Sequence, residues 1–303
     1  MSPSKPVRPQ IVNELVHAKR PACCQNFAGM DRIDIAPIVR RALEEDLPDI
    51  TSEAIFTPRD RGNAAFVIKA PGILAGLAFA EETFAELDDS SEFIRHFEDG
   101  STVQPGDVVA EVSATVIALL SGERTALNFM QRASGIAATT RLYVDAIAGT
   151  KAKIYDTRKT APGLRLLDKY AVKCGGGENH RVGLHDLFLV KNNHIDRAGS
   201  IAGALERIRS RGMVQKIMVE VRDMRELDEA LAERPDFILL DNMTPAQIRE
   251  AVARTAGRVL LEASGGITLE NVREYAEAGV DRISIGALTH SVKALDISMR
   301  VRT

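Results

Sequence analysis

The chain has 303 residues, enough for one large domain or two ordinary ones with a substantial buried core. Hydrophobic residues make up 45% of it and charged residues 27%, which is typical of a globular protein and excludes a disordered or fibrous one. The net charge of −3 provides no global basic field for nucleic acid or an anionic membrane, so any strong cationic site must be local. No apolar run reaches the roughly 20 residues that a membrane-spanning helix needs.

The first 30 residues lack an apolar core of signal-peptide length. We expect them to form a loose extension, with Met30 as a candidate start of the protein. The three cysteines, Cys23, Cys24 and Cys174, are odd in number and show neither a metal-ligand spacing nor a disulfide framework. This pattern favours a reducing, cytoplasmic location.

The part of the chain that follows, up to residue 120, mixes short elements. Apolar residues recur at helical spacing over residues 35–45, which predicts a helix. Runs of apolar and β-branched residues predict strands at residues 64–69, 72–77, 108–112 and 114–119. This mixture indicates an α+β N-terminal domain.

Residues 121–148 are compatible with one long helix, which Gly149 would close as a C-cap. After this helix the sequence pattern changes, and strand-like runs alternate with amphipathic helical stretches. We expect strands to begin near residues 153, 187, 216, 237, 259 and 282, and helices at residues 201–209, 224–232, 245–253 and 269–278. Such repeated alternation predicts parallel βα units, and periodicity alone leaves a barrel and a doubly wound sheet both open.

Polar residues follow every predicted parallel strand. In chain order these strand ends are Asp156-Thr157-Arg158-Lys159, Lys191-Asn192-Asn193-His194, Glu220-Val221-Arg222, Asp241-Asn242, Ser264-Gly265-Gly266 and Ser284-Ile285-Gly286. In a βα barrel the active site is built at the carboxyl ends of the strands, from the loops that follow them. We therefore expect these residues to form a site together, although at any one strand a return of polarity is unremarkable.

Basic residues from these strand ends, Arg158, Lys159 and Lys191, together with His180 and Arg181, supply donors that suit a small anion. Arginine can hold a carboxylate through two parallel hydrogen bonds. Lys191, if buried, is also suited to Schiff-base chemistry, so an aldolase remains an alternative.

The acids Glu220 and Asp241 close two successive strands. Paired carboxylates there can hold Mg²⁺ through its water ligands or bind sugar hydroxyls, and the alternative is that they only pair with neighbouring cations. The small residues of Ser264-Gly265-Gly266 and Ser284-Ile285-Gly286 leave backbone N–H groups open to a phosphate. Barrels often bind phosphate after their last two strands, which favours this interpretation.

Arg124 lies in the first turn of the predicted long helix, where the helix dipole disfavours a cation. Either an ion pair with Glu123 or another acid offsets this, or Arg124 binds an anion. Together, these patterns predict a cationic pocket at the carboxyl ends of the strands, with an acidic pair and with a phosphate site on one side.

These motifs, in this order, resemble the quinolinate phosphoribosyltransferase family. The matching segments are SGERTALNFMQRASGIAATT, DTRKTAPGLRLLDKYAVKCGGGENHRVGLHDLFLVKNNHI, VEV, LLDN, EASGGI and SIGALTHS, and the resemblance spans residues 31–303. It departs from the family at residues 45–52, where Pro48 stands in a shortened turn that usually contains glycine, but none of the candidate site residues lies there.

The resemblance implies an α/β fold with an α+β N-terminal domain and an incomplete, seven-stranded βα barrel. The implied limits are an extension at 1–30, an N-terminal domain at 31–127 plus 289–303, and a barrel at 128–288. It implies a homodimer that transfers phosphoribosyl from phosphoribosyl pyrophosphate to quinolinate with Mg²⁺, giving nicotinate mononucleotide, CO₂ and pyrophosphate, a step of NAD biosynthesis.

The resemblance also implies roles for particular residues. Arg124 would reach the partner's site, while Arg158, Lys159, Thr160, His180 and Arg181 would cradle quinolinate. Lys191 would lie between the two substrates, and Glu220 and Asp241 would lie near the ribose and Mg²⁺. The 5′-phosphate would contact the remaining matched positions, Ser264, Gly265, Gly266, Ser284, Ile285, Gly286 and His290. A related phosphoribosyltransferase with another acceptor is the main alternative to quinolinate transfer.

Overall fold

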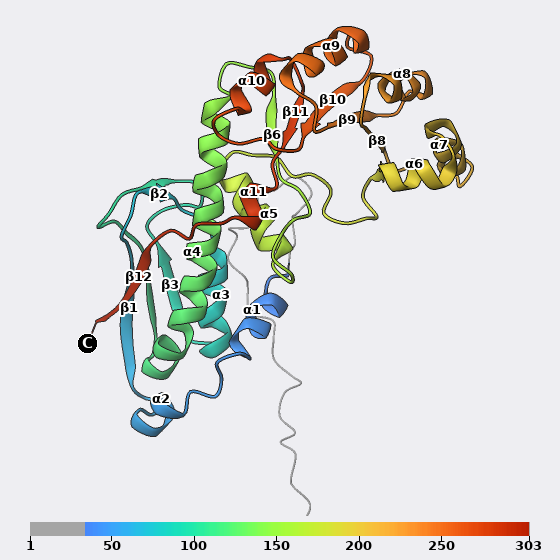
Figure 1. The fold of residues 1–303 in the computed structure, drawn as a ribbon. Coiled ribbons are helices and arrows are strands. Elements are labelled where there is room, and N and C mark those ends of the chain that lie inside the picture. The colour runs from blue at the N-terminus through green and yellow to red at the C-terminus, as the bar shows by residue number, and fades with distance from the viewer. Residues whose placement is uncertain (1–33, 303) are drawn as a thin grey trace, which may run out of the picture. The chain divides into compact units, whose positions relative to one another are not determined.

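The computed structural model describes residues 34–302, and the expected extension at 1–30 lies outside the described residues (Figure 1). Helix α1 (Ala36–Leu43) confirms the helix predicted from apolar spacing. The short helix α2 (Ile50–Ile55) was not predicted, and it begins where the Asp49 side chain accepts hydrogen bonds from the N–H groups of Thr51 and Ser52. Pro48 in the preceding turn follows a cis peptide bond.

An antiparallel sheet of four strands, in the order β12-β1-β5-β3, forms the core of the first half of the chain. Its strands are β12 (Ile297–Arg302), β1 (Arg61–Ile68), β5 (Val108–Thr115) and β3 (Glu92–Arg95). Strand β12 comes from the C-terminus and pairs with β1 from Asn63↔Arg302 to Ile68↔Ile297. Helix α3 (Leu77–Leu87) and a two-stranded ribbon of β2 (Gly72–Ile73) and β4 (Thr102–Val103) complete this half.

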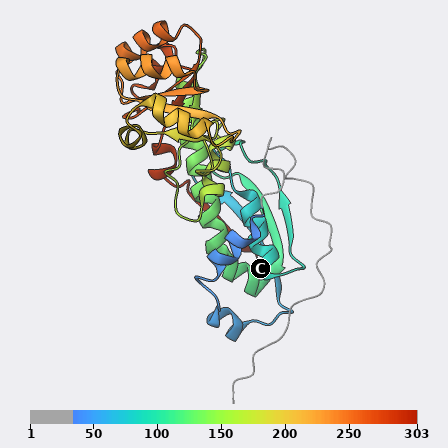
Figure 2. The same ribbon diagram turned by 90° about the vertical axis from the view of Figure 1, so that its right-hand side faces the viewer.

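The long helix α4 (Val116–Ala146) contacts strands of both sheets (Figures 1 and 2). It begins five residues earlier than the sequence predicts, because the Thr115 hydroxyl accepts a hydrogen bond from the N–H of Ala118 and caps the helix. The strand predicted at 114–119 is therefore wrong beyond Thr115, where β5 ends. Gly135 lets the chain pass closely, since a Cβ there would lie 2.2 Å from the carbonyl oxygen of Lys293.

A six-stranded parallel sheet, in the order β6-β11-β10-β9-β8-β7, forms the second half. Its strands are β6 (Lys153–Tyr155), β11 (Arg282–Ser284), β10 (Leu260–Ser264), β9 (Phe237–Asp241), β8 (Ile217–Val221) and β7 (Phe188–Val190). All six predicted strands are present, and the sheet order ends at β6 and β7. A seven-stranded count is not confirmed, because beyond these six strands the described residues add only an isolated parallel bridge from Tyr155 to Glu178.

Helices connect these strands and cover the sheet. They are α5 (Arg165–Cys174), α6 (Asn192–Ala198), α7 (Ile201–Arg209), α8 (Met224–Glu233), α9 (Pro245–Thr255), α10 (Val272–Glu277) and α11 (Ala287–His290). Four of them were predicted and begin at or near the expected residue, with Ser200, Asp223 and Thr244 as side-chain N-caps. Helices α5, α6 and α11 were not predicted.

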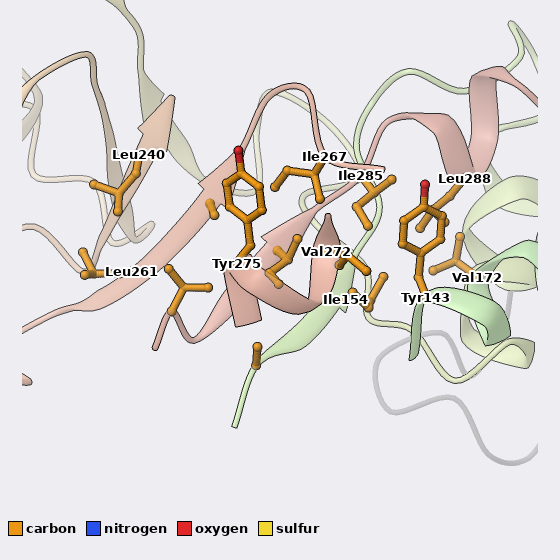
Figure 3. Close-up of a cluster of buried hydrophobic side chains, with 14 of the residues drawn as sticks. Tyr143, Ile154, Val172, Leu240, Leu261, Ile267, Val272, Tyr275, Ile285 and Leu288 are labelled. Atoms are coloured by element: carbon orange, nitrogen blue, oxygen red, sulfur yellow. The ribbon is translucent and has the colours of Figure 1, made fainter. Parts of the chain in front are cut away.

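The hydrophobic residues on the helix-facing side of the parallel sheet pack against these helices (Figure 3). Ile154, Leu240 and Leu261 point from their strands into this layer and are almost completely buried. Burial of one such side chain contributes about 1.5–3 kcal/mol to the free energy of unfolding. On the other side of the sheet a smaller cluster contains Met218 and Phe237. The sheet is thus held rigidly, with its carboxyl ends left for polar residues.

Candidate active site

Four of the parallel strands end at a common level. Ser264 at the end of β10 is in register with Asp241 of β9 on one side and with Ser284 of β11 on the other. Ser284 is in turn in register with Tyr155 of β6, directly before Asp156. Because neighbouring parallel strands run in the same direction, the residues that follow them meet at one edge of the sheet.

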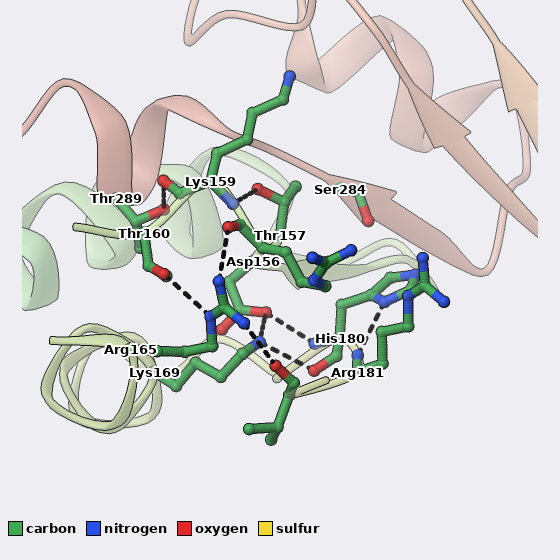
Figure 4. Close-up of polar contacts among 12 residues, drawn as sticks. Asp156, Thr157, Lys159, Thr160, Arg165, Lys169, His180, Arg181, Ser284 and Thr289 are labelled. Atoms are coloured by element: carbon green, nitrogen blue, oxygen red, sulfur yellow. Dashed lines mark hydrogen bonds and ion pairs between the residues drawn. The ribbon is translucent and has the colours of Figure 1, made fainter. Parts of the chain in front are cut away.

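Two cationic segments lie close together at this edge: residues 156–160, which follow β6, and residues 180–181, which follow α5 (Figure 4). We call them the cationic loops. Arg181 is half-buried, and its Nη1 donates a hydrogen bond to the carbonyl oxygen of Leu187 at 3.0 Å. Burial and the positive charge of Arg158 both lower the pKa of Arg181. Two guanidinium groups that repel each other in this way indicate a site for an anion.

His180 is neutral at pH 7 and its tautomer is fixed. Burial, followed by the positive charges of Lys169, Arg181, Arg282 and Lys191, lowers the pKa of His180 to about 4. Its Nδ1 accepts a hydrogen bond from the N–H of Arg181 at 2.8 Å, so the ring proton is on Nε2. The imidazole can therefore donate a hydrogen bond from Nε2.

Lys191 and Glu220 form an ion pair at the ends of β7 and β8, with 2.8 Å between Nζ and Oε2. The Lys191 side chain is 48% exposed and that of Glu220 is 10% exposed. Lys191 is therefore not the buried lysine that the aldolase alternative required. Asp241, on the next strand, accepts a hydrogen bond from the side-chain amide of Asn242 at 3.0 Å.

Beside the cationic loops, at the same edge of the sheet, are residues 264–266 and 284–286, which we call the glycine turns. Gly265 has φ +95°, and a Cβ there would lie 2.1 Å from Oδ1 of Asn242, so only glycine fits. At Gly286 a Cβ would lie 2.9 Å from Cδ of Lys159 and 3.2 Å from the His290 ring. Within residues 34–302, the N–H groups of Gly265, Gly266 and Gly286 donate no hydrogen bond. They are thus open to an anion, with two basic side chains beside Gly286.

Two further residues of the glycine turns make internal hydrogen bonds instead. The Ser284 hydroxyl donates to Oε1 of Glu262, and the N–H of Ile285 donates to the carbonyl oxygen of Tyr155 at 2.9 Å. In the segment 284–286 it is the N–H of Gly286 that faces no acceptor among the described residues.

Arg124 is not brought together with the other candidates. Since α4 starts at Val116, Arg124 lies in the third turn of the helix and not in the first. The helix dipole acts within the first turn, so it does not disfavour this cation, and that part of the sequence argument is wrong. Arg124 is exposed and, among residues 34–302, makes neither the ion pair with Glu123 nor any other polar contact.

The cationic loops are held in place by three residues to which the sequence assigned no individual role: Asp156, Arg165 and Lys169 (Figure 4). Asp156 and Lys169 form an ion pair of 2.6 Å with both side chains fully buried. Burial raises the pKa of Asp156 to about 6, and the charge of Lys169 opposes this rise. Asp156 directly follows β6. A carboxylate directly after a buried strand is the feature of the sequence that could have indicated its role.

Glu262 is a fourth unassigned residue, on β10 in the interior of the sheet. It is fully buried, and burial raises its pKa to about 7. Its Oε1 accepts from Ser284 and lies 3.5 Å from Nε2 of His180, whereas its Oε2 has no partner among the described residues. Glu262 thus lies between the cationic loops and the glycine turns.

The described residues hold no group of three or more His, Cys, Asp or Glu side chains placed to bind a metal ion. Glu220 and Asp241 alone provide too few ligands for a cage made only of protein. A pair of carboxylates does fit Mg²⁺ that keeps its waters and is also bound by a phosphate-containing substrate.

This fold and site define an α/β protein with basic side chains and open N–H groups, suited to anions, at the carboxyl edge of a parallel sheet. Within the described residues, no helix has both the length and the apolar character to span a bilayer. Two family models match the chain: the quinolinate phosphoribosyl transferase N-terminal domain over residues 49–134 and the C-terminal domain of the same family over residues 136–300. The chain therefore belongs to the quinolinate phosphoribosyltransferase family.

Individual relatives agree with this assignment. The chain is 44% identical over 275 residues to a probable carboxylating nicotinate-nucleotide pyrophosphorylase of Bacillus subtilis, covering 90% of this chain and 95% of that relative. It is 46% identical over 271 residues to the carboxylating enzyme of Mycobacterium leprae, covering 86% and 95%. Among solved structures, nicotinate-nucleotide pyrophosphorylase from Ehrlichia chaffeensis has a TM-score of 0.85 at 40% identity, covering 89% of this chain and 100% of that one.

Proposed function

We propose that the protein transfers phosphoribosyl from phosphoribosyl pyrophosphate to quinolinate and releases CO₂, giving nicotinate mononucleotide and pyrophosphate in the cytoplasm. The single observation that carries this proposal is that the cationic loops lie beside the glycine turns at one edge of the sheet. One side of the site suits a dicarboxylate, and the other suits a phosphate. Family membership supports the same reaction.

On the quinolinate side, we propose that the carboxylates bind Arg158, Lys159, Thr160, His180 and Arg181. The neutral His180 would donate from Nε2, and the arginines would donate in pairs. Thr160 supports the loop, since its hydroxyl accepts a hydrogen bond from Nε of Arg165 at 3.1 Å.

On the sugar side, the 5′-phosphate would bind the open N–H groups of Gly265, Gly266 and Gly286, with Ser264 and His290 beside them. Ser284 and Ile285 belong to the same turns and shape them. Lys191 would contact both substrates, and its ion pair with Glu220 would bring that acid near the ribose, next to Asp241.

We propose Mg²⁺ as the cofactor, bound mainly by pyrophosphate and water, with Glu220 and Asp241 as its protein neighbours. When bound, the ion supplies positive charge to the pyrophosphate leaving group.

In the proposed reaction the quinolinate ring nitrogen forms a bond to the anomeric carbon of the ribose. The bond from that carbon to pyrophosphate breaks, and pyrophosphate leaves with the electron pair. A carboxylate of Glu220 or Asp241 stabilises the positive charge that develops on the sugar. The ring nitrogen is then cationic, so the bond between the neighbouring ring carbon and its carboxylate can break. CO₂ leaves, and the ring carbon keeps the electron pair and takes a proton from water. The cationic loops mainly orient the ring.

We further propose a homodimer in which Arg124 completes the partner's site. Its exposed position on α4, without a polar partner among the described residues, supports this role. We also propose that the six-stranded sheet is the open barrel of the family, with the bridge at Glu178 in place of a seventh strand. The domain limits 31–127 plus 289–303 and 128–288 remain a proposal, supported by the pairing of β12 with β1, although α4 runs unbroken through residue 127.

The acceptor is tested by mixing the purified protein with Mg²⁺, phosphoribosyl pyrophosphate and either quinolinate or nicotinate. We expect CO₂ and nicotinate mononucleotide from quinolinate, and no product from nicotinate, which lacks the second carboxylate. Product from nicotinate but not from quinolinate would overturn the proposal and favour a related transferase with another acceptor. Borohydride trapping of a substrate on Lys191 would instead favour the aldolase alternative.

A further inference from the structure

Helix α5 presents two cations to the site from one face. Arg165 and Lys169 are four residues apart, so their side chains lie one above the other on the helix. Figure 4 shows both side chains extending toward the cationic loops. The proposed reaction assigns neither of them a role.

Lys169 joins the ends of the two cationic loops. Its Nζ donates hydrogen bonds to Oδ1 of Asp156 at 2.6 Å and to the carbonyl oxygen of His180 at 2.9 Å. The same Oδ1 accepts from the N–H of His180 at 2.7 Å. The ammonium of Lys169 and the carboxylate of Asp156 thereby join Asp156, at the start of one cationic loop, to His180, at the start of the other.

Arg165 joins the same two loops one helical turn away. Its Nε donates to the hydroxyl of Thr160 at 3.1 Å and its Nη1 to the carbonyl oxygen of Val182 at 3.1 Å. Its Nη2 donates to the carbonyl oxygen of Arg158 at 3.4 Å. Because a guanidinium is planar and rigid, these contacts fix the distance between the two cationic loops.

The loops need such a connection because the side chains that they carry repel each other. Burial and then the charge of Arg158 lower the pKa of Arg181, and the second cause reflects this repulsion. A ring with two adjacent carboxylates binds well only when its cationic partners are already at the correct separation. The contacts of α5 are made with backbone carbonyls, Thr160 and Asp156, so they leave the guanidinium groups of Arg158 and Arg181 available.

We propose that Arg165 and Lys169 are positioning residues that set the separation of the cationic loops and thereby the affinity for a dicarboxylate acceptor. This rests on the proposed function for the identity of the acceptor. Neither side chain has a hydrogen bond to the glycine turns among the described residues, so we expect the effect of their loss to fall mainly on one substrate.

The test compares Arg165→Gln with Arg165→Lys and with a control, Arg254→Gln. Arg165 is half-buried, so its replacement leaves the core intact. Arg254 is a surface arginine on α9 that also binds two acceptors, Asp228 and Glu250. The measurements are kcat, the KM of each substrate, the calorimetric Kd of quinolinate, and Tm.

For Arg165→Gln we expect the quinolinate KM and Kd to rise about tenfold, while the KM of phosphoribosyl pyrophosphate stays within about twofold and Tm within about 2 °C. Arg165→Lys should recover part of the affinity, and Arg254→Gln should change neither constant. An unchanged quinolinate Kd, or an equal rise in both KM values, would overturn the proposal. Lys169→Met is the stronger variant: where it folds, it should raise the quinolinate Kd more than Arg165→Gln does.

The two proposals fail differently. If the unaltered protein binds quinolinate but forms no product with phosphoribosyl pyrophosphate, the proposed function fails, and the calorimetric comparison still decides the role of Arg165. If the unaltered protein turns over quinolinate and Arg165→Gln binds it normally, only the positioning role fails. If the unaltered protein does not bind quinolinate, both proposals fail.

Discussion

The cationic loops and the glycine turns offer an anion two different kinds of binding group. The cationic loops use side-chain charge, and they need the buried Asp156–Lys169 ion pair to hold repelling groups together. The glycine turns use backbone N–H groups, and they need residues without a Cβ, such as Gly265 at φ +95°. We expect the cationic loops to discriminate between substrates by the number and spacing of their carboxylates, and the glycine turns by close steric fit. Substrate specificity should therefore depend mainly on the cationic loops.

The largest expected effect comes from breaking the charged side with Arg158→Ala. Loss of charge-assisted hydrogen bonds worth about 2–3 kcal/mol should raise the quinolinate KM between about 30-fold and about 150-fold. The KM of phosphoribosyl pyrophosphate should stay nearly constant, because the glycine turns are intact. Steady-state kinetics with each substrate varied in turn would measure this, and an unchanged quinolinate KM would remove Arg158 from the site.

A smaller effect, mainly on phosphoribosyl pyrophosphate and not on quinolinate, is expected for Gly286→Ala. The added Cβ would lie 2.9 Å from Cδ of Lys159, so this side chain or the turn must move. Such overpacking costs about 1–3 kcal/mol, and we expect a rise of about tenfold in the KM of phosphoribosyl pyrophosphate. The KM of quinolinate should rise by less, because only one of its proposed partners, Lys159, is displaced. Gly203→Ala on α7, far along the chain from both turns, is the control. A larger effect on quinolinate than on phosphoribosyl pyrophosphate would contradict the division between the two sides.

The smallest effect on substrate binding is expected for Glu262, which contacts both sides through His180 and Ser284 and acts on stability instead. Its pKa is raised from 4.5 to about 7, so between these pH values the folded protein binds more protons than the unfolded one. Stability from this group is thus present at low pH and is lost as pH rises through 7, by an amount on the order of 3 kcal/mol. Asp156, with its pKa raised to about 6, acts in the same direction, and His180, with its pKa lowered to about 4, acts in the opposite one.

The comparison of the unaltered protein with Glu262→Gln isolates the contribution of Glu262. Glutamine has similar volume and does not ionise, so the variant should lose less stability between pH 5 and pH 8. Urea unfolding at both pH values measures the difference. Parallel pH dependence in the two proteins would show that Glu262 does not titrate in this range.

The sequence predicted the parallel strands well, because buried parallel strands are short continuous apolar runs such as FILL before Asp241. It also placed helices whose amphipathic pattern is clear and whose N-caps are polar, such as α8 and α9. It missed α5, because Asp168 and Lys169 lie on its buried face and hide the apolar stripe. It misassigned 114–119, because a β-branched run resembles a strand until Thr115 is seen to cap a helix.

For the site, the sequence predicted which residues lie at the strand ends, since chain order alone places them there. It could not predict the supporting contacts. Asp156 contacts Lys169 only because α5 folds back toward the end of β6. Glu262 on β10 contacts His180, which lies far from it in the sequence. Ser284 and Ile285 likewise looked open to a phosphate until Glu262 and the Tyr155 carbonyl were found to bind them.

The most direct test of the central claim is a crystal structure with pyridine-2,3-dicarboxylate bound. We predict both carboxylates within about 3 Å of donors on the cationic loops, with the guanidinium of Arg158 among them, and the glycine turns left open for the sugar phosphate. A ligand bound at the glycine turns instead, with Arg158 and Arg181 making no contact to it, would contradict the account.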